Sequence, residues 1–435
     1  MMNIRIKAGL ITTDNKSYDG VEKAVLVGLS AESMESFERS TETSMEELEA
    51  LLETAGGKTC AVVLQSRRAP EPRTFIGAGK VNEIKKLIMD HDCNLVVFDN
   101  ELSPSQMRAL SEDIGVKVLD RSGLILDIFA GRAKSREGRL QVELAQSKYL
   151  LPRLVGMWSH LVSQTASGAG HIGTRGPGET QLESDRRHIR RKISKLEKEL
   201  SDVSRIRNTQ RRQRQKNSVP TVALVGYTNA GKSTLLNALT DSDVQAQDRL
   251  FDTLDTTTRR FKPDGMTEVL LSDTVGFIRK LPHQLVEAFK ATLEELCYAD
   301  MLIHVIDASN SDWPNQARVV EGLIAELGAG KTPRLDVFNK CDKAVELPAR
   351  RDNSVFVSAK TGEGLEELKK VIMKMLGQGT KKLRLLFPYD KGGFLEHLHR
   401  ECRVLTIDYT QRGIEVVAEC SEKDYVKFRE YAIEM

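Results

Sequence analysis

Eight consecutive residues have the types and spacing G-x-x-x-x-G-K-S of a phosphate-binding loop. They are Gly226, Tyr227, Thr228, Asn229, Ala230, Gly231, Lys232 and Ser233. Glycines at both ends of such a loop allow successive backbone N–H groups to face one anion. Lys232 would reach the β- and γ-phosphates of a nucleotide, and Ser233 would ligate Mg²⁺. The bland alternative is a turn that merely starts a helix, but the apolar run 222–225 and the helical spacing of 234–239 supply the context that the motif requires.

A second short motif is typical of a γ-phosphate and Mg²⁺ contact. It consists of Asp273, Thr274, Val275 and Gly276, directly after the apolar run 269–272. An Asp at a strand end can hold Mg²⁺ through water, and the N–H of Gly276 can meet the γ-phosphate.

Two more motifs concern the base. The first is Asn339, Lys340, Cys341 and Asp342, and the second is Ser358, Ala359 and Lys360. The Asp342 carboxylate would accept two hydrogen bonds from the edge of guanine, whereas adenine would leave it unpaired. Asn339 can donate to the base, the stem of Lys340 can lie over the ring, and residues 358–360 would contribute backbone N–H groups. Together the four motifs predict a guanine nucleotide, GTP or GDP, bound with Mg²⁺.

The elements that position these motifs alternate between strand and helix. Short apolar runs at 222–225, 269–272, 302–307, 335–339 and 355–358 are separated by helical stretches. This pattern predicts a doubly wound α/β domain over 218–380, with its ligand at the carboxyl ends of the strands.

Residues 1–120 predict a smaller α/β domain with a mostly parallel sheet. Strand-like runs lie at 24–29, 60–64, 95–98 and 116–119, and helical stretches at 81–89 and 104–111. Ser44 and Glu47 have the spacing of a capping box, which predicts a helix from Ser44 to Leu52. Gly77-Ala78-Gly79-Lys80 is half a phosphate loop, and we interpret it as a turn.

Residues 121–217 are expected to be helical and basic. Helical runs at 124–129 and 140–151 precede a glycine-rich stretch, 163–178, and Thr180 to Glu183 fit a capping box that would begin a long helix. From Arg186 to Lys216 there are thirteen Lys and Arg against three acidic residues. We expect this helix to fold into a hairpin near Ser201–Asp202. Such a charge run is often only a solvated face, but its imbalance favours binding to structured RNA through phosphates.

The remaining residues, 381–435, predict a small α+β module without recognisable chemistry. The 64 basic and 62 acidic residues nearly balance, so overall charge identifies no partner. Six scattered cysteines without a C-x-x-C pair indicate reduced thiols rather than a zinc site or disulfide framework. The chain has neither a membrane-length apolar run nor a signal-peptide core, so we expect a cytoplasmic protein, and a monomer.

Several stretches resemble the HflX family of ribosome-associated P-loop GTPases. They are the loop 226–233, Gly176-Pro177-Gly178-Glu179-Thr180-Gln181-Leu182-Glu183 before the basic helix, and Asp273-Thr274-Val275-Gly276-Phe277-Ile278. The resemblance implies GTP hydrolysis, binding to the large (50S) ribosomal subunit with its 23S rRNA, and GTP-dependent splitting of stalled ribosomes, often under stress. The alternatives are a GTPase of ribosome assembly or RNA modification, and a GTP switch that binds a protein.

The family pattern Phe-x-Thr-Leu-Asp matches Phe251, Asp252, Thr253, Leu254 and Asp255. It favours Thr253 as the Mg²⁺ ligand of the GTP state, with Thr257 as the alternative. Phe277 stands where many GTPases carry a Gln that orients water, so intrinsic hydrolysis should be slow. Asn229 matches an Asn that related GTPases use to bind a monovalent cation, which raises the hypothesis that K⁺ accelerates hydrolysis; a purely loop-stabilising Asn is the alternative. The expected catalytic residues are therefore Lys232, Thr253, Gly276 and Asn229.

Overall fold

The computed structural model describes residues 21–35, 38–165, 177–216, 219–240, 250–251, 257–264, 267–282, 285–287, 289, 294–376, 381–391, 393–420 and 422–433. The chain divides into two compact units that are each assembled from separate ranges. Unit 1 comprises residues 1–213, 247–256 and 275–294, and unit 2 comprises 214–246, 257–274 and 295–435. The finer division into 1–120, 121–217, 218–380 and 381–435 stays a prediction.

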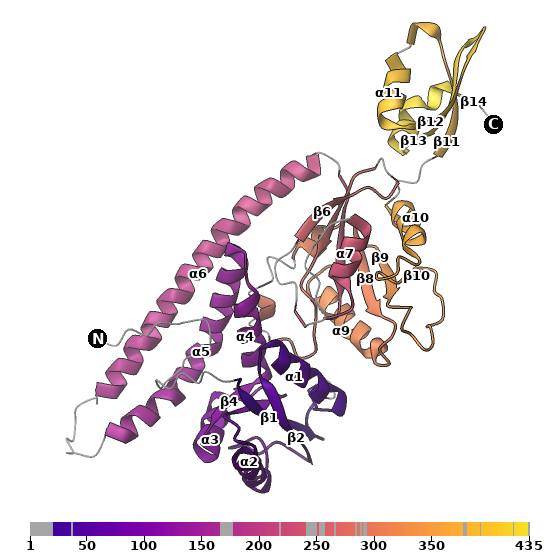
Figure 1. The fold of residues 1–435 in the computed structure, drawn as a ribbon. Helices are drawn as coiled ribbons and strands as arrows, with labels where there is room; N and C mark the ends of the chain where they lie inside the picture. Colours follow the sequence, from indigo (N-terminus) through magenta and orange to yellow (C-terminus); the bar gives the residue numbers. More distant parts are fainter. Residues whose placement is uncertain are drawn as a thin grey trace. The chain divides into compact units, whose positions relative to one another are not determined.

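Unit 1 contains the small parallel sheet that the sequence predicts (Figure 1). Its strands are β1 (Lys23–Ala31), β2 (Lys58–Arg67), β3 (Leu95–Phe98) and β4 (Lys117–Asp120), in the order β2-β1-β3-β4. They alternate with α1 (Glu42–Thr54), α2 (Ala78–His91), α3 (Pro104–Ile114) and α4 (Arg121–Arg132). The sequence order reverses between β1 and β3, and at such a point the carboxyl ends of two strands border an open crevice.

The cap of α1 differs from the expectation. Thr41, not Ser44, is the N-cap: its hydroxyl accepts from the Ser44 N–H at 3.2 Å, and the Ser44 hydroxyl accepts from the Thr41 N–H at 2.8 Å. Ser44 therefore fills the third helical position, where a side chain that reaches back completes the box. In the half phosphate loop, Gly77 is the N-cap of α2, and Lys80 pairs with Glu83 at 2.8 Å.

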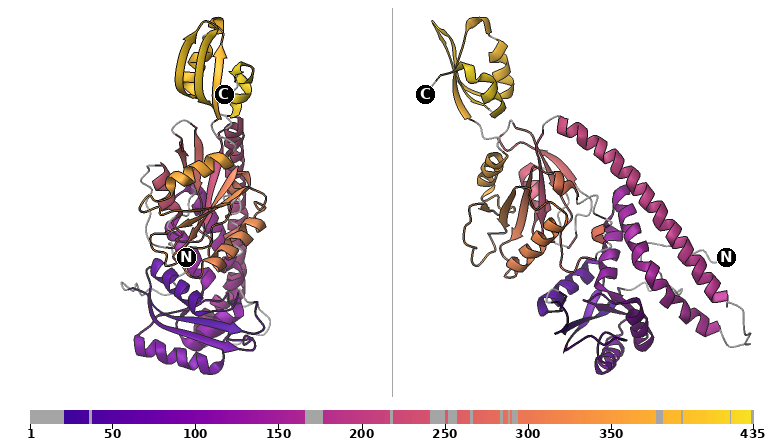
Figure 2. Two further views of the ribbon diagram at one scale, coloured as in Figure 1. Left: turned by 90° about the vertical axis from the view of Figure 1, so that its right-hand side faces the viewer. Right: turned by 180° about the vertical axis from the view of Figure 1, so that it is seen from behind.

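Two long helices follow, α5 (Arg136–Thr165) and α6 (Pro177–Lys216), and Figures 1 and 2 show them side by side. Ion pairs join them, with Lys192 and Glu143 2.7 Å apart and Lys148 and Glu197 3.2 Å apart. On α6, Leu196 is buried, and Ile189, Ile193 and Leu200 are half-buried, as their helical spacing predicts. The side chain of Leu182 lies outside the described part.

The predicted turn at Ser201–Asp202 is wrong, because α6 continues without interruption for 40 residues. It also begins at Pro177 rather than Thr180. Ser and Asp cost a helix interior only a few tenths of a kcal/mol, roughly, and neither Gly nor Pro is present to end it there. The hairpin is formed instead by α5 and α6.

Unit 2 contains a six-stranded sheet in the order β10-β9-β8-β5-β7-β6. Its strands are β5 (Thr221–Gly226), β6 (Thr257–Phe261), β7 (Val269–Asp273), β8 (Met301–Asp307), β9 (Arg334–Asn339) and β10 (Ser354–Phe356). All pairs are parallel except β6 with β7. The polar strand β6 has no apolar run and was not expected. The helices are α7 (Lys232–Thr240), α9 (Trp313–Glu326) and α10 (Leu365–Met375), and a 3₁₀ turn, η1, spans Glu294–Tyr298.

The core of this sheet consists of fully buried aliphatic side chains from adjacent strands and α7, among them Val222, Leu224, Leu235, Leu271 and Val305. Continuous apolar strands of this kind are typical of parallel sheets covered by helices on both faces. The doubly wound α/β domain predicted from the sequence is confirmed.

The last part of unit 2 is a four-stranded antiparallel sheet in the order β12-β13-β11-β14. It comprises β11 (Lys381–Phe387), η2 (Tyr389–Lys391), α11 (Gly393–Glu401), β12 (Arg403–Thr410), β13 (Gly413–Cys420), α12 (Glu422–Phe428), η3 (Arg429–Tyr431) and β14 (Ala432–Ile433). Its own core includes Leu385, Phe387, Leu398, Val416 and Phe428. This is the α+β module that the sequence predicts.

All six cysteines are free thiols. Within the described ranges, no helix is long and apolar enough to cross a lipid bilayer.

Candidate nucleotide site

The predicted phosphate loop connects β5 to α7 and depends on two glycines. A Cβ at Gly226 would lie 2.3 Å from the Val305 carbonyl oxygen on β8. At Gly231, where φ is +90°, a Cβ would lie 2.3 Å from the Asn339 side-chain nitrogen. A larger residue at Gly226 would require movement of the β8 backbone, and one at Gly231 would displace the Asn339 amide and strain the backbone at its positive φ. The loop therefore follows a path that exposes backbone N–H groups at the N-terminus of α7.

Lys232 is buried at the base of this loop. Its ammonium donates to the carbonyl oxygens of Gly226 at 3.1 Å and Tyr227 at 2.8 Å. Burial lowers the pKa of Lys232 to about 8, the charge of Lys340 acts in the same direction, and Asp273 opposes them. A bound phosphate would give the buried ammonium a negatively charged partner and so favour its protonated form.

Ser233 and Asp273 meet where a Mg²⁺ ion would be required. The Ser233 hydroxyl donates to Asp273 Oδ2 at 2.7 Å, and the Asp273 carboxylate is fully buried at the end of β7. A hydroxyl and a carboxylate are hard oxygen ligands of the kind that Mg²⁺ prefers, so these residues fit the ion. Thr274 fixes this end of β7, because its hydroxyl donates to the Leu224 carbonyl at 2.6 Å.

The four residues between the first and second glycine of the loop differ in exposure. Tyr227, Thr228 and Ala230 are buried, whereas Asn229 is exposed and has a left-handed φ of 61°. Asn tolerates that conformation better than most residues. This geometry agrees equally with a loop-stabilising role and with a ligand for a monovalent cation.

The side chain of Asn339, at the end of β9, is hydrogen-bonded to two other segments of the site. Its Nδ2 donates to the Ala230 carbonyl at 2.9 Å, and its Oδ1 accepts from the Ala359 N–H at 3.0 Å. The sequence motif predicts a contact between Asn339 and the base, whereas in the structure its amide joins the phosphate loop to residues 358–360. The close approach of Gly231 to this amide explains why a glycine stands there.

The neighbours of Asn339 include the other residues predicted to contact the base. Asp342 accepts from the buried Ser358 hydroxyl at 2.7 Å, which orients its carboxylate. Lys340 has a left-handed φ of 61°, and its ammonium pairs with Asp307 at 2.7 Å. Cys341 donates through sulfur to the Phe338 carbonyl at 3.2 Å, and Lys360 is exposed. The structure thus brings 339–342 and 358–360 together at the carboxyl ends of β9 and β10.

The remaining predicted residues lie on other segments. Asp252, Thr253, Leu254 and Asp255 lie outside the described residues, and Thr257 is the first residue of β6, opposite Asp273. Phe251, Val275 and Gly276 belong to unit 1. Phe277 is buried, with 2% of its surface exposed. The roles assigned to these residues stay predictions.

The phosphate loop lies between the first strand and helix of a doubly wound sheet, and guanine-type motifs lie at further strand ends. This combination defines the class of P-loop GTPases. Family models match residues 42–130, described as a GTP-binding GTPase N-terminal region, and 132–214, described as the middle region of such GTPases. A third model, described as a 50S ribosome-binding GTPase, matches residues 221–340.

The chain is similar to GTPase HflX of Caldanaerobacter subterraneus subsp. tengcongensis, with 45% identity over 95% of this chain and 94% of that protein. It is 46% identical to GTPase HflX of Lacrimispora saccharolytica, over 91% of this chain and 93% of the relative. A solved structure of a GTP-binding protein from Sulfolobus solfataricus in complex with GDP is 27% identical and covers 82% of this chain and 99% of its own, with a TM-score of 0.41. The chain belongs to the HflX family of GTPases.

Proposed function

We propose that this GTPase binds the large ribosomal subunit through 23S rRNA and, in its GTP state, splits stalled or idle ribosomes into subunits under stress. The observation that carries the proposal is the exposed basic face of α6. A match to a model described as a 50S ribosome-binding GTPase supports the choice of partner.

Two acidic residues of α6 take part in ion pairs, while many of its basic residues are exposed. Glu197 pairs with Lys148 of α5, and Glu199 lies 3.9 Å from both Arg136 and Lys195. Exposed cations on the same helix are Arg187, Arg190, Arg191, Lys195 and Lys198. Clustered Lys and Arg displace counterions from a phosphate backbone, which makes RNA binding favourable and salt-dependent.

Within the nucleotide site, Lys232 would neutralise charge on the β- and γ-phosphates, and the Gly276 N–H would meet the γ-phosphate. Ser233, Asp273 and Thr253 would hold Mg²⁺, which supplies further positive charge to the phosphates when bound. Asn229 would ligate K⁺. Equal hydrolysis rates in K⁺ and Na⁺ would contradict that last assignment.

Light scattering of intact ribosomes, mixed with the protein and a non-hydrolysable GTP analogue, tests the proposal. We expect scattering to fall as subunits separate, and to stay constant with GDP. Constant scattering with both nucleotides, together with binding to 50S particles, would instead support a role in assembly or RNA modification. Retention on protein partners in nuclease-treated extract, without ribosome binding, would support a protein-binding switch.

A further inference from the structure

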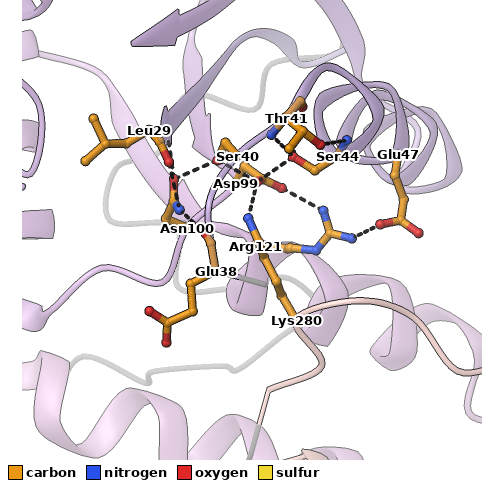
Figure 3. A network of polar contacts seen from close by, with 10 residues as sticks. All are labelled: Leu29, Glu38, Ser40, Thr41, Ser44, Glu47, Asp99, Asn100, Arg121 and Lys280. Atoms are coloured by element: carbon orange, nitrogen blue, oxygen red, sulfur yellow. Dashed lines mark hydrogen bonds and ion pairs between the residues drawn. The ribbon is translucent and has the colours of Figure 1, made fainter. Parts of the chain in front are cut away.

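A buried cluster of charges lies at the carboxyl end of β3 in unit 1. Asp99, directly after β3, is fully buried, and Figure 3 shows the side chains that converge on it. Arg121 Nη1 donates to Asp99 Oδ1 at 2.7 Å, and the Ser40 hydroxyl donates to Oδ2 at 2.7 Å. A further cation, the Lys280 ammonium, pairs with Oδ2. Arg121 also pairs with Glu47 of α1.

The cluster lies where the strand order of the N-terminal sheet reverses. Asp99 and Asn100 follow β3, and Ser40 lies in the connection between β1 and α1, so these residues border the point where the strand order reverses. In open α/β sheets this crevice is where ligands bind. Here it receives Lys280, a residue that is distant in sequence and lies seven positions beyond Asp273. In the N-terminal sheet, a side chain of the same protein therefore lies at the strand ends where such sheets usually bind ligands.

Lys280 is held firmly in this position. Its side chain is only 12% exposed, and its backbone adopts a left-handed φ of 53°, which is uncommon for lysine. Burial lowers the pKa of Lys280, and the facing Asp99 carboxylate opposes this effect. Burial also raises the pKa of Asp99, but the charges of Arg121 and Lys280 outweigh it, so the net pKa is lowered and the carboxylate stays ionised. A buried charge is retained where its partners are in place.

Lys280 lies at the end of a buried segment that begins inside the γ-phosphate motif. The boundary between the two compact units falls between Thr274 and Val275. Phe277 is 2% exposed and Ile278 is fully buried. Within unit 1 the segment is held by the Lys280 pair with Asp99, and Thr274, the residue before it, is bonded to Leu224 within unit 2.

A second contact holds the other segment that a γ-phosphate should order. Phe251, with a left-handed φ of 55°, packs edge-on against Phe129 of α4, with ring centroids 4.6 Å apart. Phe289 packs on the same ring at 5.5 Å. The ranges 247–256 and 275–294, on either side of the β6–β7 hairpin in sequence, thus both belong to unit 1.

We propose that Lys280 is a positioning residue for GTP hydrolysis: its ion pair with Asp99 orders the segment 275–280, which contains Gly276, the residue assigned above to the γ-phosphate. The physical basis is preorganisation, because a segment that is already ordered loses less freedom when the phosphate binds. The inference rests on the assignment of Gly276 in the proposed function. It adds that residue 280 and the N-terminal sheet determine how well the site responds to the third phosphate.

The test compares Lys280→Met, which keeps the stem and removes the charge, with the wild-type chain. We expect the Kd of a non-hydrolysable GTP analogue to rise at least about fivefold, a typical coupling between linked sites. The Kd of GDP should stay unchanged, and the single-turnover hydrolysis rate should fall. Loss of general stability would weaken both nucleotides alike, so the GTP-to-GDP affinity ratio separates positioning from damage.

Two controls make the result specific. Glu287→Gln removes an exposed ion pair with Lys148 seven positions beyond Lys280 (3.6 Å, Glu287 69% exposed) and should change neither Kd. Asp99→Asn also removes the Arg121 pair, so the informative comparison adds Lys280→Met to it: this second change should not alter the affinity ratio further, because the Lys280 pair is already broken. Additive losses would overturn the proposal, as would an unchanged ratio or faster hydrolysis in Lys280→Met.

Gly276→Ala distinguishes failure of this inference from failure of the proposed function. The added methyl group should crowd the N–H that meets the γ-phosphate and reduce affinity for the GTP analogue but not for GDP. If Gly276→Ala has this effect and Lys280→Met does not, the γ-phosphate assignment stands and the positioning role of Lys280 is wrong. If neither variant affects the ratio, the assignment of Gly276 itself is wrong.

Discussion

At the scale of single residues, the nucleotide site places one ammonium in an unusual environment. Lys232 has its charge in a buried position, where the loop carbonyls of Gly226 and Tyr227 accept its hydrogen bonds. Its pKa of about 8 puts the loss of that charge close to neutral pH. As pH rises, the affinity for nucleotide should therefore fall, whereas the contribution of Lys232 to the free energy of unfolding should increase.

Nucleotide affinity should fall as pH rises through 8, because only protonated Lys232 attracts phosphate and bound phosphate raises its pKa. Between pH 7 and 9 the protonated fraction of a group with a pKa near 8 falls roughly tenfold, and the affinity for GDP should follow. Calorimetry at pH 8 in two buffers of different ionisation enthalpy should show uptake of about half a proton per GDP bound. Release of protons would contradict this.

The same lowered pKa has the opposite consequence for folding. Unfolded lysine titrates near 10.5, so between about pH 8 and 10.5 the unfolded chain binds more protons at this residue than the folded chain. The contribution of Lys232 to the free energy of unfolding should therefore increase with pH across that window. Lys232→Met should remove this contribution, which urea unfolding at pH 8 and pH 10 can measure.

Asp342→Asn should change base preference from GTP to xanthosine triphosphate. The carboxylate is oriented by the Ser358 hydroxyl at 2.7 Å, and an amide in its place presents a donor to guanine where an acceptor is required. Loss of a matched hydrogen-bonding edge changes discrimination by at least about a hundredfold. Competition binding with both nucleotides measures the change. As a control, Asp307→Asn removes the partner of Lys340 and should change the affinities for GTP and xanthosine triphosphate together. If Asp342→Asn still prefers GTP, the assignment of Asp342 to the base is wrong.

At the scale of elements, α6 is the clearest departure from expectation. An unbroken helix across Ser201 leaves no place for a proline, which would clash with the preceding turn and remove a hydrogen bond. Ser201→Pro should therefore reduce the free energy of unfolding by about 3 kcal/mol, measured with urea. Ser201→Ala should be neutral or slightly stabilising. Were Ser201→Pro tolerated as well as Ser201→Ala, a turn at this position would be the better description.

Local patterns predicted most of the elements and the phosphate loop, because a loop such as 226–233 is specified by adjacent residues. Caps were harder, since both Thr41 and Ser44 can accept the hydrogen bond and only the fold decides which does. The polar strand β6 has no apolar signal. Contacts between distant residues were not predictable at all: nothing in the sequence around Lys280 indicates that its partner is Asp99, and nothing around Asn339 indicates its bonds to Ala230 and Ala359.

At the scale of the whole molecule, the chain combines a nucleotide sheet in one compact unit with a basic helix and a parallel sheet largely in the other. If the exposed face of α6 binds RNA, its charge should control attachment to ribosomes without affecting nucleotide binding. Arg187, Arg190 and Arg191 are suited to the test, because each is exposed and belongs to none of the ion pairs found among the described residues.

The triple variant Arg187→Gln, Arg190→Gln and Arg191→Gln should bind 50S particles more weakly than the wild-type chain. For this variant, the slope of log Kd against log salt concentration should be smaller by about one for each RNA phosphate that it no longer neutralises. Co-sedimentation across a salt series with a GTP analogue measures both quantities.

A control of equal charge removes three exposed cations from the N-terminal sheet domain, by Lys58→Gln, Lys86→Gln and Arg108→Gln. Both triple variants should bind GDP with unchanged affinity. Equal weakening by the two variants would mean that total charge, rather than the face of α6, attracts the ribosome.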